Sequence, residues 1–552
     1  MKFRLGVFLR VLIWQSGFVG MIRCAAIILS LLGFVAAGCG IHRDRARLQE
    51  EQPLIQEPLR ILVVGDPDLA AAIDRLRAEW RGQAGYEVEV EESSREGLAE
   101  RISAQPIPHA VLLPYGLFPQ VAESISLAEI PGSILEDGRG LWTGIFGTLR
   151  VRVLRWGEKP VAVPFGNPVF VLYVRPDKLE EAGVKIPTTW EEYKRVAEKL
   201  AKLPADKSSP PFASRLSDRG SPGKQGTGSE SQSPESTEGD SLKREEKADG
   251  EKLGYGLSET GVSPAGRRWF GALEPLGPGW RGLVLLARAA AYVSHRDNYS
   301  TFFSIDTMEA LIDREPFVRA LEELVAVARL GPPEILDYGP DNVREAFWRG
   351  ECGMAMTWPT AAHRAEWPEN SPPVTFAGVP GSWEVFDLRK GVWEKRRREE
   401  SPQVPLLGLD GRVGVVPASS GRVNDAFQFL FWASSEQAGE IAARLPVCTL
   451  YRTDQMTTPN IWVEAPVPSG AAIEYVLLIR QILEKPVGLL ALPVPGREEY
   501  LAALDDAVAA AVRGDLSPHE ALHQAAVKWE EITERLGRQR QLAAFRRSLG
   551  LR

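Results

Sequence analysis

Two histidines four residues apart, His519 and His523, belong to the pattern His-Glu-x-x-His. On a helix this spacing puts both imidazoles on one face, where they could hold Zn²⁺ while Glu520 acted as a general base for peptide hydrolysis. Two features oppose that chemistry. Ser517 and Glu520 are placed to cap the start of the same helix, and no carboxylate that could complete the ligand set follows Glu534. We therefore expect no metal site and no catalytic residue, and adventitious surface metal binding in preference to catalysis.

Cys39 is a second residue whose setting suggests chemistry. It follows a short basic start and an apolar run, 25–37, that is too short to span a bilayer and typical of a signal-peptide core. The sequence Ala36-Ala37-Gly38-Cys39 resembles the lipobox of bacterial lipoproteins, so the thiol of Cys39 would carry diacylglycerol and several acyl chains would anchor the protein stably. An ordinary secretory signal and an uncleaved anchor are the alternatives. The start is either Met1 or Met21.

Export would leave Cys352 and Cys448 in an oxidising compartment. The two could form a disulfide, but the sequence does not give the distance between them. The charged run at 395–400 is expected to lie on a solvated loop.

The composition narrows the class of protein. The chain has 552 residues, of which 44% are apolar and 25% are charged, and this is the composition of a globular protein. The net charge of −8 argues against a nucleic-acid binder. Four cysteines are too few for a disulfide-built scaffold, and the lack of an apolar run of about 18 residues excludes a polytopic membrane protein.

Strands and helices alternate from residue 60 onward. Residues 60–64 form a short apolar strand, and residues 68–82 have apolar side chains at helical spacing. Strands at 86–91 and 109–113 enclose a helix at 96–103. This order predicts an α/β fold with a mostly parallel sheet that helices cover.

The middle of the chain contains a change of direction and an insertion. Two prolines interrupt the β-rich stretch 161–175, which favours a strand that crosses between lobes. Thr189 and Glu192 predict a capping box at the start of a helix. Residues 204–252 have almost no apolar side chains and predict a disordered insertion. Further helices are predicted at 281–292, 305–312, 315–329, 341–349, 422–433, 435–444, 470–483 and 497–513, and further strands at 353–357, 374–379 and 411–416.

Four segments carry a family resemblance. They are residues 109–130, which end in Ser-Leu-Ala-Glu-Ile, residues 161–199 with Pro-Thr-Thr-Trp-Glu-Glu, residues 347–358 with Gly-Met-Ala-Met-Thr-Trp, and residues 514–532. In their order and spacing these segments resemble the extracellular solute-binding proteins of bacterial ABC importers, in the sugar-binding family 1 that includes maltose-binding protein. The resemblance covers most of 58–552 and is interrupted by 204–252.

The resemblance implies a two-lobed periplasmic-binding-protein fold of the α/β class. Crossing hinge strands join the lobes, and the cleft between them closes around a ligand. The resemblance implies a signal peptide at 1–38 and a lipid-anchored tether at 39–57. Lobe 1 would comprise 58–164 and 376–435, and lobe 2 would comprise 165–375 and 436–552. The insertion 204–252 would lie in lobe 2, and the C-terminal helices would end that lobe.

Aromatic rings can cover the apolar faces of a sugar while polar groups bind its hydroxyls. The resemblance makes Trp358, at the end of the strand 353–357, the first candidate, and Tyr115 follows the strand 109–113. Phe165 and Asn167 lie at the crossing between lobes, and Trp383 follows Pro-Gly. Lobe packing or a hinge turn is the alternative role of these residues. Replacing Trp358 by alanine is expected to weaken ligand binding with little loss of fold.

The implied protein is lipid-anchored, lies outside the cytoplasm, and captures a small solute, with a carbohydrate as the expected class, for an ABC permease. It would need no cofactor, bind no nucleic acid, contact the membrane through its lipid alone, and be a monomer. The chain has His109-Ala110 where many relatives have Asp, and Tyr173-Val174-Arg175 in place of Tyr-Asn-Lys, so a non-sugar solute stays open. The alternatives are an exported hydrolase, including the zinc protease, and a binding protein that feeds a sensor.

Overall fold

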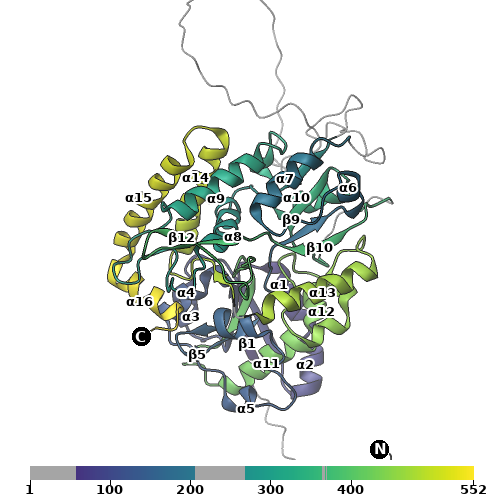
Figure 1. Ribbon diagram of the computed structural model, residues 1–552. Helices are drawn as coiled ribbons and strands as arrows, with labels where there is room; N and C mark the ends of the chain where they lie inside the picture. The colour runs from purple at the N-terminus through teal and green to yellow at the C-terminus, as the bar shows by residue number, and fades with distance from the viewer. Residues whose placement is uncertain (1–56, 205–267, 363–366, 368–369, 486, 552) are drawn as a thin grey trace, which may run out of the picture. The chain divides into compact units, whose positions relative to one another are not determined.

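Two β-sheets organise the chain in a computed structural model (Figure 1). The structure describes residues 57–204, 268–362, 367, 370–485 and 487–551. The predicted signal peptide, almost all of the predicted tether, and the predicted insertion beyond Pro204 therefore lie outside the described residues.

The first sheet has five strands in the order β2-β1-β3-β14-β6. Its strands are β1 (Leu59–Val64), β2 (Val88–Ser93), β3 (Ala110–Pro114), β6 (Ala162–Pro164) and β14 (Arg412–Val415). β1 runs parallel to β2 and β3, as the alternation of strands and helices predicts. β14 arrives from far along the chain and pairs antiparallel with β3 on one side and β6 on the other.

Short helices accompany the first sheet. They are α1 (Pro67–Arg75), α2 (Arg77–Ala84), α3 (Leu98–Ser103), α4 (Phe118–Ser124), α5 (Gly132–Leu135), α11 (Val423–Ser435) and α12 (Ala438–Ala442). The helix predicted at 68–82 is divided into α1 and α2 at Leu76. Leu69, Ile73, Leu76 and Trp80, the apolar side chains at helical spacing, are nevertheless all buried, because both helices keep the same face against the sheet.

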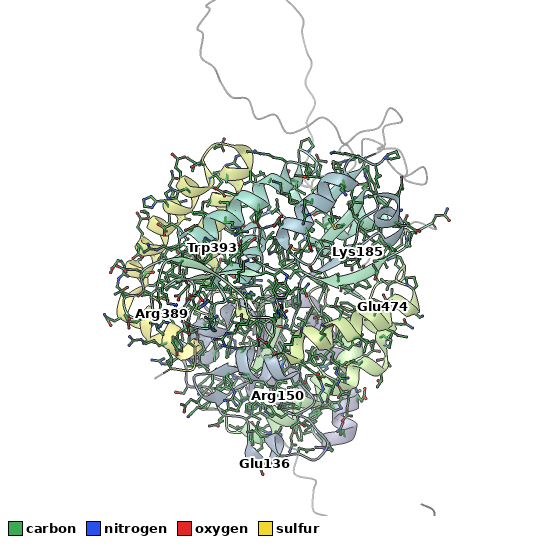
Figure 2. All side chains as sticks on the ribbon, viewed as in Figure 1. Glu136, Arg150, Lys185, Arg389, Trp393 and Glu474 are labelled. Atoms are coloured by element: carbon green, nitrogen blue, oxygen red, sulfur yellow. The ribbon has the colours of Figure 1, made fainter. Side chains whose placement is uncertain are left out.

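The second sheet has four strands in the order β10-β7-β9-β8. They are β7 (Val171–Val174), β8 (Phe270–Leu273), β9 (Cys352–Thr357) and β10 (Thr375–Gly378). α7 (Trp190–Leu200) packs so closely on β8 that a Cβ on Gly271 would lie 1.9 Å from the carbonyl oxygen of Ala197. α10 (Pro340–Trp348) packs on β9, and α13 (Ser469–Glu484) covers β10, where Thr375 bonds to Glu474 (Figure 2).

The remaining helices extend this half of the fold, and the last of them also contacts α4 of the first half. They are α6 (Pro176–Glu181), α8 (Arg281–Val293), α9 (Glu315–Ala328), α14 (Arg497–Arg513), α15 (Pro518–Leu536) and α16 (Arg538–Ser548). α14 packs against α8, α9 and α15, so the C-terminal helices form a second layer outside the helices of the second sheet. Figure 1 shows α14, α15 and α16 together in yellow.

Three short strand pairs complete the fold. They are β4 (Arg155–Trp156) with β5 (Lys159–Pro160), β11 (Glu384–Asp387) with β12 (Val392–Lys395), and β13 (Leu406–Leu407) with β15 (Leu489–Leu490). The predicted crossing near 161–175 is confirmed, because β6 belongs to the first sheet and β7, six residues further on, to the second.

Hydrogen-bonded caps fix several helix ends where the sequence predicts them. Thr189 and Glu192 form the predicted capping box of α7. Ser517 and Glu520 form that of α15, with Pro518 in the first turn. Gly514 ends α14 in the left-handed conformation, with φ at 79°, which a residue without a Cβ adopts at low cost.

The helix predicted at 305–312 is wrong. Residues 305–307 form a turn, and Phe303 makes an isolated antiparallel bridge with Ala310. The hydroxyl of Ser304 accepts hydrogen bonds from the backbone N–H groups of Asp306 and Thr307, which gives this segment a local alternative to helix.

Candidate functional site

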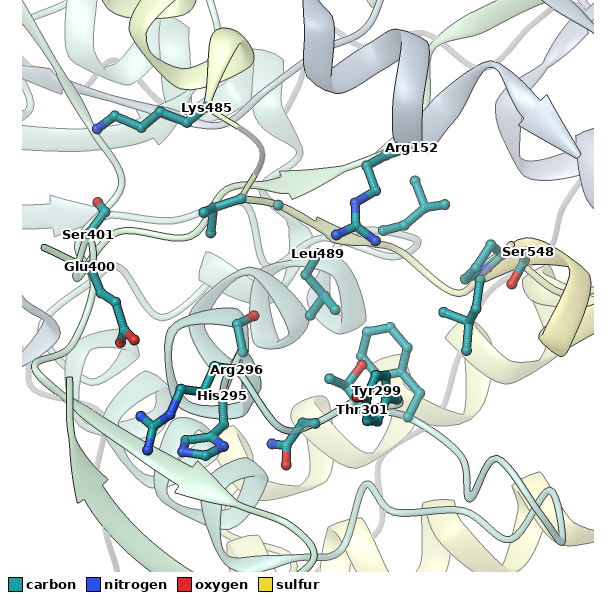
Figure 3. A pocket seen from close by; sticks show the side chains of 18 of the residues that line it. Arg152, His295, Arg296, Tyr299, Thr301, Glu400, Ser401, Lys485, Leu489 and Ser548 are labelled. Atoms are coloured by element: carbon teal, nitrogen blue, oxygen red, sulfur yellow. The ribbon is translucent and has the colours of Figure 1, made fainter. Parts of the chain in front are cut away.

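A cavity of about 900 Å³ is bounded by elements of both halves of the fold (Figure 3). One wall is the π-helical turn η2 (Leu149–Val153), which precedes β4 and the first sheet's β6. Another is the segment that follows α8 in the second half. The lining residues fall at Arg152, within 294–302, within 396–401, within 485–493 and within 545–551. The cavity therefore has the position and size of a site for a small molecule.

Hydrogen bonds hold the segment after α8 against the hairpin β11–β12. The buried ring of His295 accepts the N–H of Asp297 at Nδ1, and its Nε2 lies 3.1 Å from Glu394 on β12. Asn298 donates to two backbone carbonyls, including that of Phe386, and accepts the N–H of Leu388. This wall is thus fixed by its own contacts, and its hydrogen-bonding groups are largely used within the protein.

Glu394 is a centre of negative charge behind this wall. Lys390 and then His295 bond to it and lower the pKa of Glu394 to about 2. The guanidinium of Arg296, which lines the cavity, also reaches Glu394, at 3.0 Å. The positive charge of Arg296 is therefore matched inside the protein.

Arg396 is also a structural cation. Its side chain is only 4% exposed and donates to the backbone carbonyls of Ala291, Ser294 and Ser382. Burial lowers its pKa. The expectation that 395–400 is a solvated run is wrong for this residue, because its guanidinium satisfies carbonyls at the C-terminal end of α8.

Three further cavity residues, Arg152, Lys485 and Tyr299, are placed to meet a ligand. Arg152 and Lys485 are exposed, and neither forms an ion pair with another residue that the structure describes. Tyr299 is 75% exposed. Figure 3 shows Arg152 extending into the cavity above Leu489, with His295, Arg296, Tyr299 and Thr301 below. The arrangement offers an aromatic face, a hydroxyl and two cationic groups, which suits the binding of a small molecule.

A second cavity of about 900 Å³ lies beside α12. Of its charged residues, Arg452 and Asp454 bond to each other, and its one ring, that of Trp462, is only 1% exposed. It therefore offers a solute no accessible aromatic face.

His295, Asp297 and Asp387 place potential metal-ligand atoms within 4.8 Å of one another. The geometry does not suit a metal. Both ring nitrogens of His295 are already engaged, and Lys390 lies 2.9 Å from the carboxylate of Asp387. The same lysine lowers the pKa of Asp387 to about 2. A lysine ammonium at this carboxylate takes the place that a cation would need.

Trp358 is packed inside the second half of the fold, with 2% of its surface exposed. Its ring centroid lies 5.2 Å from that of Trp280 and 5.8 Å from that of Phe170. Its indole N–H donates to the carbonyl of Pro446 at 3.0 Å. Trp358 does not line the cavity of Figure 3.

Tyr115, Phe165 and Asn167 are also buried and do not line this cavity. Burial raises the pKa of the Tyr115 phenol. The backbone carbonyl of Asn167 accepts the hydroxyl of Thr449 at 2.5 Å, while its side-chain nitrogen is buried without a partner among the described residues. Trp383 is 47% exposed and lies outside the cavity. The sequence-predicted residues and the cavity are therefore in different places.

Cys352 and Cys448 are free, buried thiols, so the disulfide considered from the sequence is not formed in the structure. Cys352 begins β9, whereas Cys448 lies against Gly166 at the crossing between the sheets. Burial raises the pKa of both thiols, to about 12 at Cys448. Cys39 lies outside the described residues.

The His-Glu-x-x-His segment is at the exposed start of α15. The carboxylate of Glu520 accepts from the backbone N–H and the hydroxyl of Ser517, and these bonds lower its pKa. His523 lies 3.3 Å from Asp313. The glutamate therefore serves the helix end, as the capping pattern predicts.

Sequence reasoning missed Arg152, Tyr299 and Lys485. Tyr299 stands in the polar stretch Ser-His-Arg-Asp-Asn-Tyr-Ser-Thr, which follows a predicted helix, and an aromatic residue in such a loop was the available signal. Arg152 and Lys485 have no distinctive neighbours in sequence, and only the fold brings them to one cavity.

Comparison with known proteins identifies the family. A family model described as bacterial extracellular solute-binding protein matches residues 72–446. The chain belongs to this family. The comparison with curated proteins found no match to this chain.

Solved structures share the fold at low sequence identity. A solute-binding protein of Agrobacterium radiobacter in complex with ribitol is 16% identical, with a TM-score of 0.55, and the match covers 87% of this chain and 100% of that one. The sugar-binding protein MalE of Xanthomonas citri is 16% identical, with a TM-score of 0.58, and the match covers 87% and 98%. Maltose-bound MalE3 of T. maritima is 16% identical, with a TM-score of 0.52, covering 86% and 99%.

These matches confirm the two-lobed binding-protein fold that the sequence predicts. The family is one of binding proteins, and its extracellular character puts this solute-binding protein outside the cytoplasm. Among the described residues, no helix has both the length and the apolar character needed to cross a bilayer.

Proposed function

We propose that this solute-binding protein is anchored through a lipid on Cys39, binds a sugar or polyol, and delivers it to an ABC permease. The observation that carries the proposal is the cavity of Figure 3, which two halves of a solute-binding fold enclose. The solved neighbours named with ribitol and maltose support the ligand class. Closure of the two halves around the solute would be a hinge motion.

We assign 58–164 and 376–435 to lobe 1, and 165–375 and 436–552 to lobe 2. The membership of β14 in the first sheet and of β7, β8 and β9 in the second supports this division, whereas β10 (Thr375–Gly378) extends the second sheet three residues past the assigned boundary. Trp358, Tyr115, Phe165, Asn167 and Trp383 remain proposed contacts of an opened cleft. The unpartnered side-chain nitrogen of Asn167 supports its inclusion, because opening would let it bond a hydroxyl.

The ligand class is tested with a soluble protein that begins after Cys39. Ribitol, mannitol, maltose, monosaccharides and their uronate and phosphate forms are screened by thermal shift and then by calorimetry. A solute at about 100 times its dissociation constant adds about 2.7 kcal/mol to the free energy of unfolding, so the shift is readily measured. A panel without any stabilising sugar or polyol would contradict the proposal.

The cavity is tested by replacing Tyr299 with alanine. Loss of a ring that covers a sugar face is expected to weaken binding about two- to tenfold. The melting temperature should not change, because the side chain is 75% exposed. Ile473→Ala is the control, since this apolar side chain is also exposed, at 51%, and lies outside the cavity. Equal affinities for the wild type and Tyr299→Ala would remove the cavity from the proposal.

Lipidation is tested separately in a bacterial host that is fed a labelled fatty acid. The wild type should carry the label and sediment with membranes, and Cys39→Ser should do neither. Label that persists on the variant would contradict anchoring at Cys39. Neither result depends on the identity of the solute.

A further inference from the structure

The charges of the cavity are unbalanced. Its lining contains four cationic side chains, on Arg152, Arg296, Arg396 and Lys485, but only two carboxylates, on Glu399 and Glu400. The chain as a whole has a net charge of −8, so this excess of cations runs against the composition of the protein.

The protein itself uses two of these cations. Arg296 lies 3.0 Å from Glu394, and the buried Arg396 donates to three backbone carbonyls. The carboxylate of Glu400 lies 3.9 Å from Arg396 and is a weak partner for the same group. After these contacts, the lining keeps Arg152 and Lys485 against the single exposed carboxylate of Glu399.

Arg152 and Lys485 stand on one wall. The hydroxyl of Thr148, the residue that precedes η2, donates to the backbone carbonyl of Lys485. This bond ties the segment that carries Lys485 to the helical turn that carries Arg152. Figure 3 shows both residues on the upper side of the cavity, across from Tyr299 and Thr301, with the side chain of Lys485 extending away from Arg152.

A neutral solute would leave both of these cations with water alone. A guanidinium fits a carboxylate or phosphate with two parallel hydrogen bonds, and a lysine adds a mobile charge beside it. On the opposite wall, Tyr299 offers a ring for an apolar sugar face and Thr301 offers a hydroxyl.

We infer that the solute is an anionic carbohydrate or polyol, whose carboxylate or phosphate lies against Arg152 while its carbon skeleton faces Tyr299, and Lys485 adds positive charge at the same wall. This inference rests on the proposed function of the cavity and narrows its ligand class. It assigns Arg152 and Lys485 as the residues that select charge, and Tyr299 as a residue that binds charged and neutral members alike.

The test compares matched pairs by calorimetry at low and at physiological salt. The pairs are glucuronate with glucose, galacturonate with galactose, gluconate with sorbitol, and glucose 6-phosphate with glucose, and inorganic phosphate is measured alone. The charged member of at least one pair should bind at least about tenfold more tightly, because hydrogen bonds between charged groups are the strong ones. The uronate and phosphate pairs separate the two sources of charge. The advantage should shrink as salt rises.

Two variants locate the effect. Arg152→Gln should weaken binding of the charged member by about tenfold, Lys485→Gln by a smaller factor that disappears at high salt, and both should leave the neutral partner unchanged. Arg195→Gln is the matched control, because Arg195 is an exposed arginine on α7 outside the cavity, with Glu191 as its partner. This control should bind both members as the wild type does.

The outcomes distinguish a failure of the anionic ligand class from a failure of the proposed function. Neutral members that bind as tightly as charged ones, or a charge preference that survives both variants, would overturn the anionic ligand and leave the proposed function standing. A panel in which no member of any pair binds would overturn the proposed function, and the anionic ligand with it. Binding of inorganic phosphate that is equal in wild type and Arg152→Gln would also overturn the assignment of Arg152.

Discussion

His109 is a buried histidine held beside positive charge. Its Nδ1 accepts the backbone N–H of Arg60 at 2.9 Å, and its Nε2 lies 3.1 Å from the guanidinium of the same residue. Burial, then Arg60 and Arg422, lower the pKa of His109 from 6.5 to about 4. The imidazole therefore stays neutral in the folded protein at pH values where the unfolded chain would protonate it.

The first prediction concerns the pH dependence of stability. Between about pH 6.5 and 4 the unfolded state binds a proton at His109 that the folded state does not. The free energy of unfolding therefore decreases as the pH falls through this range, by up to about 1.4 kcal/mol per pH unit. Its stabilising contribution is fully present above pH 6.5. His109→Asn keeps an acceptor for Arg60 and cannot titrate. Urea unfolding at pH 7.5, 6 and 5 should show a shallower decline for the variant, and parallel profiles would contradict the assignment.

Trp358 is a core residue in the structure, although the sequence made it the first candidate for ligand binding. Its ring packs against Trp280 and Phe170, and its indole N–H is bonded to Pro446. We predict that Trp358→Ala lowers the free energy of unfolding by about 3–5 kcal/mol, in place of the small loss expected from the sequence. Trp358→Phe, which keeps most of the packing, should lose clearly less. Denaturant unfolding measures both, and an alanine variant as stable as the wild type would show that the ring is not part of the core.

At the scale of elements, local signals predict helix ends better than they predict a binding site. The caps at Thr189 and Ser517 are recognisable because all their partners lie within four residues. The turn after Ser304 was not predicted, because apolar spacing alone does not reveal a hydroxyl that competes for backbone N–H groups. The cavity draws its lining from five separate segments, and no local pattern connects Arg152 with Tyr299 or Lys485.

The start of α15 supplies the element-scale prediction. Ser517→Ala removes the hydroxyl that caps the helix and should lower the free energy of unfolding by about 1 kcal/mol. His519→Ala should leave stability and solute binding unchanged, because the exposed imidazole lies outside the cavity and the capping bonds belong to Ser517 and Glu520. Thermal unfolding and calorimetry with and without a chelator measure both variants. A loss of function in His519→Ala, or on chelation, would restore the metal-dependent alternative.

At the scale of the whole molecule, the chain passes repeatedly between two sheets. β14, formed by residues 412–415, lies between β3 and β6, although more than 240 residues separate it from β6. In chain order, the last strand of the first sheet therefore follows all four strands of the second sheet. The alternation of strands and helices near the N-terminus predicted a parallel sheet, but the late antiparallel strand within it depends on long-range pairing that a local pattern does not record.

The end of α7 and the start of β8 lie in contact with each other. The indole N–H of Trp269 donates to the carbonyl of Leu200 at 2.7 Å, and β8 touches α7 backbone to backbone at Gly271. The two described ends are therefore held together by their own contacts, and a short connection is enough to join them.

We predict that replacing residues 207–252, within the insertion predicted from the sequence, with a Gly-Ser linker of about eight residues leaves solute affinity unchanged, since the described lining of the cavity comes from other segments. The free energy of unfolding should stay the same or rise by about 1 kcal/mol, because a shorter loop loses less entropy on closure. As a control, shortening the turn of the β11–β12 hairpin at 388–391 should weaken binding, because Leu388 bonds to Asn298 in the cavity wall. Calorimetry and urea unfolding compare the three proteins. Weaker binding or a loss of about 2 kcal/mol in the linker variant would show that the replaced segment takes part in the folded structure or in the site.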